Sequence, residues 1–130
     1  MMKQPARLYT AVAGIFLLLQ GTSTLIFRLV PSLDQAFPAL LATTHMIPMH
    51  SALHIVTGLL AVAILYRNKG REAFLFSLGF GLFYLLLGLS GMLSGHPMGL
   101  GLQPFDHPIH LALGIVGIFT AFLETKKDSV

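Results

Sequence analysis

Charged residues are scarce in this chain. Only 10% of its 130 residues are Asp, Glu, Lys or Arg, whereas 55% are hydrophobic, and the mean hydropathy is +0.78. So few charges cannot cover the surface of a water-soluble globule, which excludes that class of protein. The composition predicts an integral membrane protein whose main partner is the lipid bilayer.

Cysteine and tryptophan are absent altogether. Without cysteine the chain can form neither disulfides nor thiolate metal sites. Nucleophilic catalysis also has little support, because there is neither a cysteine nor a serine in a glycine-flanked elbow. The sequence leaves open whether the protein is an enzyme, and enzyme is the less favoured class.

Four uncharged runs are long enough to cross the hydrocarbon core as helices. They cover residues of about 8–27, 48–66, 73–93 and 107–123, and segments with proline, glycine and charges separate them. Four such spans leave almost no chain for a soluble domain. Residues 1–130 are therefore predicted to form a single all-α domain, a membrane four-helix bundle.

The basic residues are unevenly distributed between the two ends of the predicted spans. Arg28 stands alone at one end, and the other end carries Lys3, Arg7, Arg67, Lys69, Arg71, Lys126 and Lys127. By the positive-inside rule both termini face the cytoplasm, and the loops over 28–47 and 94–105 lie outside. The net charge of +3 is then explained by the orientation of the chain in the membrane, and no nucleic-acid partner is expected.

Two of the predicted spans carry polar residues at helical spacing. His50, His54 and Gly58 stand at i, i+4 and i+8, and Asp106, His110 and Gly114 repeat this spacing fifty-six residues later. Residues with this spacing share one face of a helix. Each of these two spans is therefore predicted to present a polar face toward the interior of the bundle.

The other two spans resemble each other as well. Residues 14–23 and 81–90 share two glycines, a phenylalanine, two leucines and a serine at matching positions. Together with the two polar faces, this match predicts two parallel-repeat helical hairpins related by a pseudo-two-fold axis along the membrane normal. The alternative is that leucine-rich helices resemble one another by composition alone.

The polar faces are compatible with three arrangements. In the first, one transition metal ion is bound by His50, His54, Asp106 and His110, since imidazole and carboxylate suit zinc, iron, copper or nickel. In the second, His54 and His110 are the axial ligands of a b-type haem, and Gly58 and Gly114 make room for it. In the third, the histidines only form hydrogen bonds across the bundle.

Some of these residues also have a simpler interpretation. Asp106 is well placed to be the N-cap of the last span, which is its favoured role. Gly58 and Gly114 also suit close packing of helices in lipid. His45 and His96 fall in predicted loops.

Two functions follow from these arrangements. One is a cofactor-binding accessory or electron-transfer subunit, and the other is a purely structural or assembly subunit of a membrane complex without a cofactor. Either could associate with other membrane subunits or form a homo-oligomer.

The two motifs, His50-x3-His54-x3-Gly58 and Asp106-x3-His110-x3-Gly114, resemble those of a bacterial family of small four-helix integral membrane proteins of unknown function. The resemblance extends over almost the whole chain. It implies a bacterial inner-membrane location and no catalytic role, with these histidines as signature residues.

Overall fold

The chain folds into helices alone over the residues that the computed structural model describes, which are 4–37, 47–94, 104 and 106–128. Four helices are long, and a short one follows the first; their bounds are α1 Pro5–Leu29, α2 Pro31–Ala36, α4 Pro48–Arg67, α5 Gly70–Ser94 and α6 Asp106–Asp128. The predicted all-α class with four long apolar helices is therefore confirmed.

The helix ends follow from local sequence. α1 and α4 both begin with proline, which suits the first helical turn because its missing N–H would have no partner there. α4 ends at Asn68, which adopts a left-handed conformation (φ 55°) and donates its N–H to the carbonyl of Ile64. Asparagine tolerates this conformation better than most residues. In the charged segment between the second and third predicted spans, Arg67 and Glu72 form an ion pair of 3.0 Å.

The two predicted outer loops are described only in part. The first begins with the short helix α2, and its residues 38–46 lie outside the described part of the chain. Of the second loop, only residues 94 and 104 are described. His45 and His96 therefore lie outside the description.

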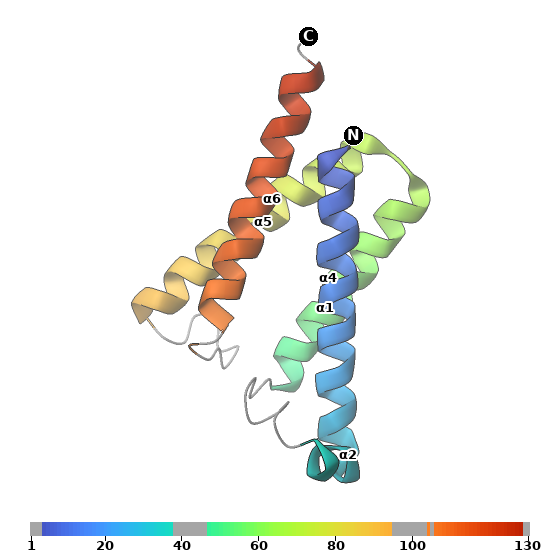
Figure 1. Cartoon of the computed structure of the whole chain (residues 1–130), viewed down its shortest axis with the longest axis vertical. Coiled ribbons are helices and arrows are strands. Elements are labelled where there is room, and N and C mark those ends of the chain that lie inside the picture. Colours follow the sequence, from blue (N-terminus) through green and yellow to red (C-terminus); the bar gives the residue numbers. More distant parts are fainter. Residues whose placement is uncertain (1–3, 38–46, 95–103, 105, 129–130) are drawn as a thin grey trace.

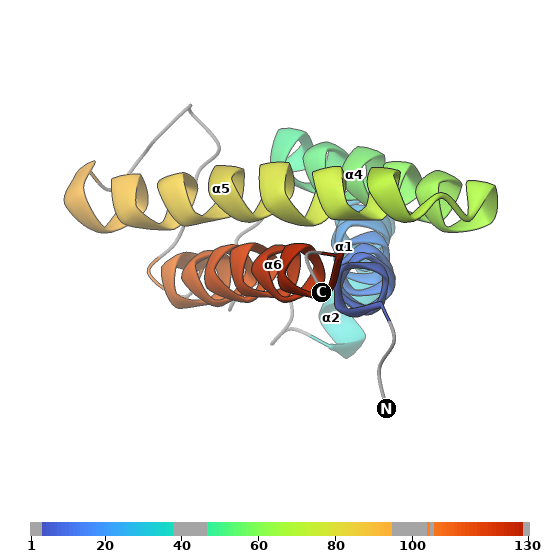
Figure 2. The ribbon, with the colours of Figure 1, turned by 90° about the horizontal axis from the view of Figure 1, so that it is seen from above.

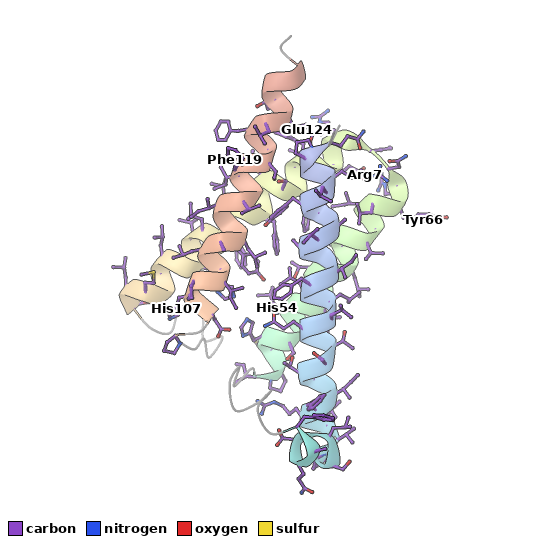
Figure 3. All side chains as sticks on the ribbon, viewed as in Figure 1. Arg7, His54, Tyr66, His107, Phe119 and Glu124 are labelled. Atoms are coloured by element: carbon purple, nitrogen blue, oxygen red, sulfur yellow. The ribbon has the colours of Figure 1, made fainter. Side chains whose placement is uncertain are left out.

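The four long helices have the length and composition of membrane spans. Their outward surface is strongly apolar: Leu19 and Phe119, for example, are 66% and 59% exposed. Figure 3 shows Phe119 and Tyr66 projecting away from the helices, whereas His54 lies inside the molecule. Exposed apolar side chains over four such helices match a lipid environment and indicate an integral membrane protein.

The helices are arranged in two hairpins. α1 packs most extensively on α4, and α5 on α6. The helices of each pair cross in Figure 1 and lie against each other in the view from above in Figure 2. The backbone N–H of Ala6 donates to Oε2 of Glu124 at 2.9 Å, so the start of α1 meets the end of α6. The start of α1, the α4–α5 turn and the end of α6 thus lie at one end of the bundle (Figure 1).

Glycines bring the backbones together within each hairpin. In the first hairpin Gly58 lies against Leu18 and the carbonyl of Gly14. In the second, Gly81 lies against the carbonyl of Gly114 and the backbone of Gly117. Such small residues allow the close helix approach that is common in lipid.

We expect Gly81→Ala to destabilise the protein and Gly79→Ala to leave it unharmed. A Cβ at position 81 would lie 2.8 Å from the backbone N of Ile118, whereas nothing lies within 4 Å of one at position 79. The first change should cost about 1–3 kcal/mol through overpacking, and the second should gain up to about 1 kcal/mol from helix propensity. Thermal unfolding in detergent measures both, and equal effects of the two would contradict the close packing of α5 on α6.

Candidate metal centre

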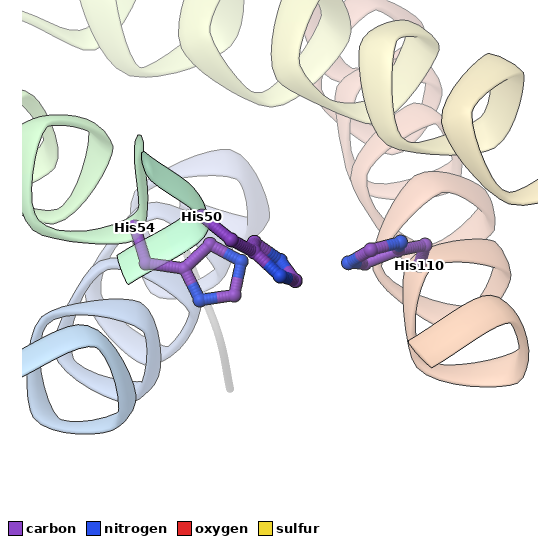
Figure 4. A group of neighbouring side chains, drawn as sticks. All are labelled: His50, His54 and His110. Carbon is purple, nitrogen blue, oxygen red and sulfur yellow. The ribbon is translucent and has the colours of Figure 1, made fainter. Parts of the chain in front are cut away.

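Three histidines from the two hairpins meet inside the molecule. His50 and His54 come from the first two turns of α4, and His110 comes from the second turn of α6. Each can offer a ring nitrogen such that the three nitrogens lie within 4.8 Å of one another. Figure 4 shows the three imidazoles pointing toward a common region, two from one helix and one from the other.

Contacts with neighbouring helices hold in place the helix segments that carry these histidines. On the first hairpin, the hydroxyls of Thr24 and Ser51 lie 3.0 Å apart in a hydrogen bond, and Gly21 lets α1 approach the Cβ of His54. On the second hairpin, Gly88 lies against Leu111, the residue that follows His110. The start of α4 is thereby held on α1, and the start of α6 on α5.

Five of the six ring nitrogens of the three histidines are buried and lack a hydrogen bond to any described residue. The side chains of His50, His54 and His110 are at most 2% exposed. Both ring nitrogens of His50 and of His54, and Nδ1 of His110, have no hydrogen-bond partner in the described part of the chain. A buried polar group without a partner lowers the stability of the fold by about 1–3 kcal/mol. This cluster therefore destabilises the protein unless a ligand binds to the nitrogens.

The size of the cluster suits a single metal ion. A tetrahedral zinc site with bonds of about 2.0–2.1 Å holds its nitrogens about 3.4 Å apart. The nitrogens here lie within 4.8 Å of one another, so none of their separations has to shrink by more than about 1.4 Å. Small rotations of the imidazoles achieve such a change.

Asp106 lies near this cluster but is not one of its members. It is buried in the first turn of α6 and interacts electrostatically with His50. Among the described residues, the group whose ligand atoms converge contains only the three histidines. A carboxylate that interacts with His50 but is not part of the converging group suits the outer shell, where it would orient a ligating imidazole.

The two glycines of the motifs face neighbouring helices. A Cβ at Gly58 would meet the Cβ of Leu18 at 2.8 Å, and one at Gly114 would meet the backbone of Leu85 even more closely. What these glycines admit is therefore a helix backbone. This contact favours the packing interpretation of Gly58 and Gly114 over room for a flat cofactor.

Tyr84 is a member of the cluster that the sequence did not indicate. Its side chain is fully buried on α5, and its ring centroid lies 4.9 Å from that of His110 and 6.4 Å from that of His54. The sequence around it, Phe83-Tyr84-Leu85, looks like ordinary apolar core. Packing of α5 on α6 brings this tyrosine to His110, and the approach of the two hairpins brings it to His54.

Comparison with protein-family models, with curated proteins and with solved structures finds no match to this chain.

Proposed function

We propose that this protein binds a transition metal ion through His50, His54 and His110, as an accessory or electron-transfer subunit of the bacterial inner membrane. The observation that supports this most is the convergence of three buried imidazoles whose nitrogens lie within 4.8 Å of one another and mostly lack hydrogen bonds. Zinc, copper, iron and nickel all accept imidazole ligands. Asp106 contributes from the outer shell.

A b-type haem is the second candidate, and the position of His50 weighs against it. The ring of His50 lies 4.4 Å from that of His54 and 5.8 Å from that of His110, while those two rings are 6.4 Å apart. A macrocycle between His54 and His110 would have to occupy the space next to both rings, where His50 already lies. A single ion accommodates all three imidazoles.

The purified protein itself tests this proposal. Material prepared without chelators from metal- and haem-replete cells should contain about one transition metal ion per chain by elemental analysis and no Soret band. A Soret band with one haem per chain would favour the haem instead. Protein that carries neither, and that binds no zinc, copper or iron on titration, would leave the structural or assembly role.

We further infer that the two hairpins are copies of one unit. Matching contacts support the duplication: Gly58 meets Leu18 in the first hairpin, and Gly114 meets Leu85 in the second. Two apolar grooves support it too. One, lined by Tyr9, Ala13 and Phe16, runs between α1 and α6, and the other, lined by Phe76, Phe80 and Phe83, runs between α4 and α5.

The orientation in the membrane can be tested with single cysteines, because the natural chain has none. With both termini cytoplasmic, Ser32→Cys in α2 should react with a membrane-impermeant maleimide in intact cells. Lys69→Cys in the α4–α5 turn should react only after permeabilisation. The reverse pattern would move the histidine cluster to the cytoplasmic half of the membrane.

A further inference from the structure

The hydroxyl of Tyr84 has no hydrogen-bond partner within the described part of the chain, although the side chain is completely buried. The other buried tyrosine behaves differently. Tyr9 is 5% exposed, and its hydroxyl donates to the carbonyl of Leu113 at 2.7 Å. The bundle can therefore satisfy a buried phenol, and the unpaired hydroxyl of Tyr84 needs its own explanation.

The position of Tyr84 relates this hydroxyl to the histidines. Its ring is 4.9 Å from that of His110, which is closer than the 5.8 Å between His50 and His110. Its 6.4 Å from His54 equals the separation of His54 from His110. By these distances Tyr84 is a fourth member of the cluster, contributed by α5.

We propose that the phenolate oxygen of Tyr84 is the fourth ligand of the ion bound by His50, His54 and His110, and that this ion is ferric iron. This inference rests on the proposed metal site. Three neutral imidazoles do not compensate the charge of the ion inside an apolar bundle, and Asp106 acts only from the outer shell. A phenolate adds one negative charge and a hard oxygen donor, and the hard donor favours Fe(III), which is a harder ion than Zn(II).

Binding of the phenolate requires that the phenol loses its proton. The O–H bond breaks as the Fe–O bond forms, and the proton leaves to the solvent. Iron enters already oxidised, so no electron is transferred in this step. The buried hydroxyl that had no partner thereby gains one.

The full-length protein in detergent, freed of metal, tests the proposal by titration with a ferric chelate. Wild-type protein should develop a phenolate-to-iron charge-transfer band in the visible spectrum, with tyrosinate vibrations in resonance Raman scattering. Tyr84→Phe keeps the ring and should lose the band and the vibrations. It should also bind iron more weakly by at least about tenfold, as loss of a supporting group typically does.

Tyr9→Phe is the matched control, because it removes the hydroxyl of the other buried tyrosine and should keep the band. Circular dichroism verifies that both variants are folded. Stoichiometric, histidine-dependent metal binding without a tyrosinate signal, or a preference for zinc over ferric iron, would overturn the role of Tyr84 and leave the proposed metal site standing. Protein that binds no metal at all would overturn both.

Discussion

His54→Ala and His110→Ala are each expected to remove most of the stabilisation that a bound metal gives this protein. A ligand that binds only the folded state at a thousand times its Kd stabilises that state by about 4 kcal/mol. Loss of one of three imidazoles should weaken zinc binding by at least about a hundredfold, since outer-shell changes alone cost 10–100-fold. Thermal unfolding in detergent, with and without zinc, measures the difference.

The combination of these substitutions should show that the two histidines act together. Once His54→Ala has removed the ion, His110→Ala has little metal-dependent stability left to remove, so the double variant should cost clearly less than the sum of the single ones. His50→Ala should match them, because its nitrogen belongs to the same converging group. Strictly additive losses would contradict a shared ion.

His107 and Asp106 provide contrasts on the same helix. His107 lies against Gly91 and is not a member of the converging group. His107→Ala should therefore keep the zinc-dependent stabilisation. Asp106→Asn should weaken zinc binding by about 10–100-fold if the carboxylate acts from the outer shell.

The features that depend on local pattern could be predicted from the sequence. Long uncharged runs fix the four spans, since any helix in lipid needs such a run. The basic residues Arg67, Lys69 and Arg71, which precede Glu72, indicate where α4 ends. The i, i+4 spacing fixes the faces of His50 and His54, because helical periodicity does not depend on the partner helix.

The features that depend on how the helices pack against one another could not be predicted. Tyr84 reaches His110 through the packing of α5 on α6, and it reaches His54 because the two hairpins approach one another at this level. Asp106 appeared as a ligand or a cap, and its distance from the converging nitrogens is a matter of tertiary geometry. Gly58 fits a cofactor or a helix equally well in sequence, and only the contact with Leu18 separates the two.

Removal of the metal is expected to loosen the junction between the two hairpins and to leave each hairpin intact. Within the hairpins, helices meet backbone to backbone at glycines such as Gly58 and Gly81. Between the hairpins, packing is less extensive, and grooves of about 330 Å³ and 400 Å³ run along the two outer seams. An ion bound by His54 from one hairpin and His110 from the other would cross-link them.

Pulsed electron–electron double resonance between spin labels at introduced cysteines measures the distance between the two hairpins. Val12 on α1 and Val116 on α6 line the groove between the hairpins and are 61% and 49% exposed. With zinc, which is diamagnetic, the Val12–Val116 pair should give one narrow distance distribution. After chelation the distribution should broaden and move to longer distances.

A pair within one hairpin is the control for this measurement. Leu19 on α1 and Leu59 on α4 are 66% and 54% exposed, and their distance should stay the same with and without zinc. In the His54→Ala background, the Val12–Val116 pair should give the metal-free distribution even in zinc. A change in both pairs would mean that the metal supports the fold as a whole, and a change in neither would mean that no ion bridges the hairpins.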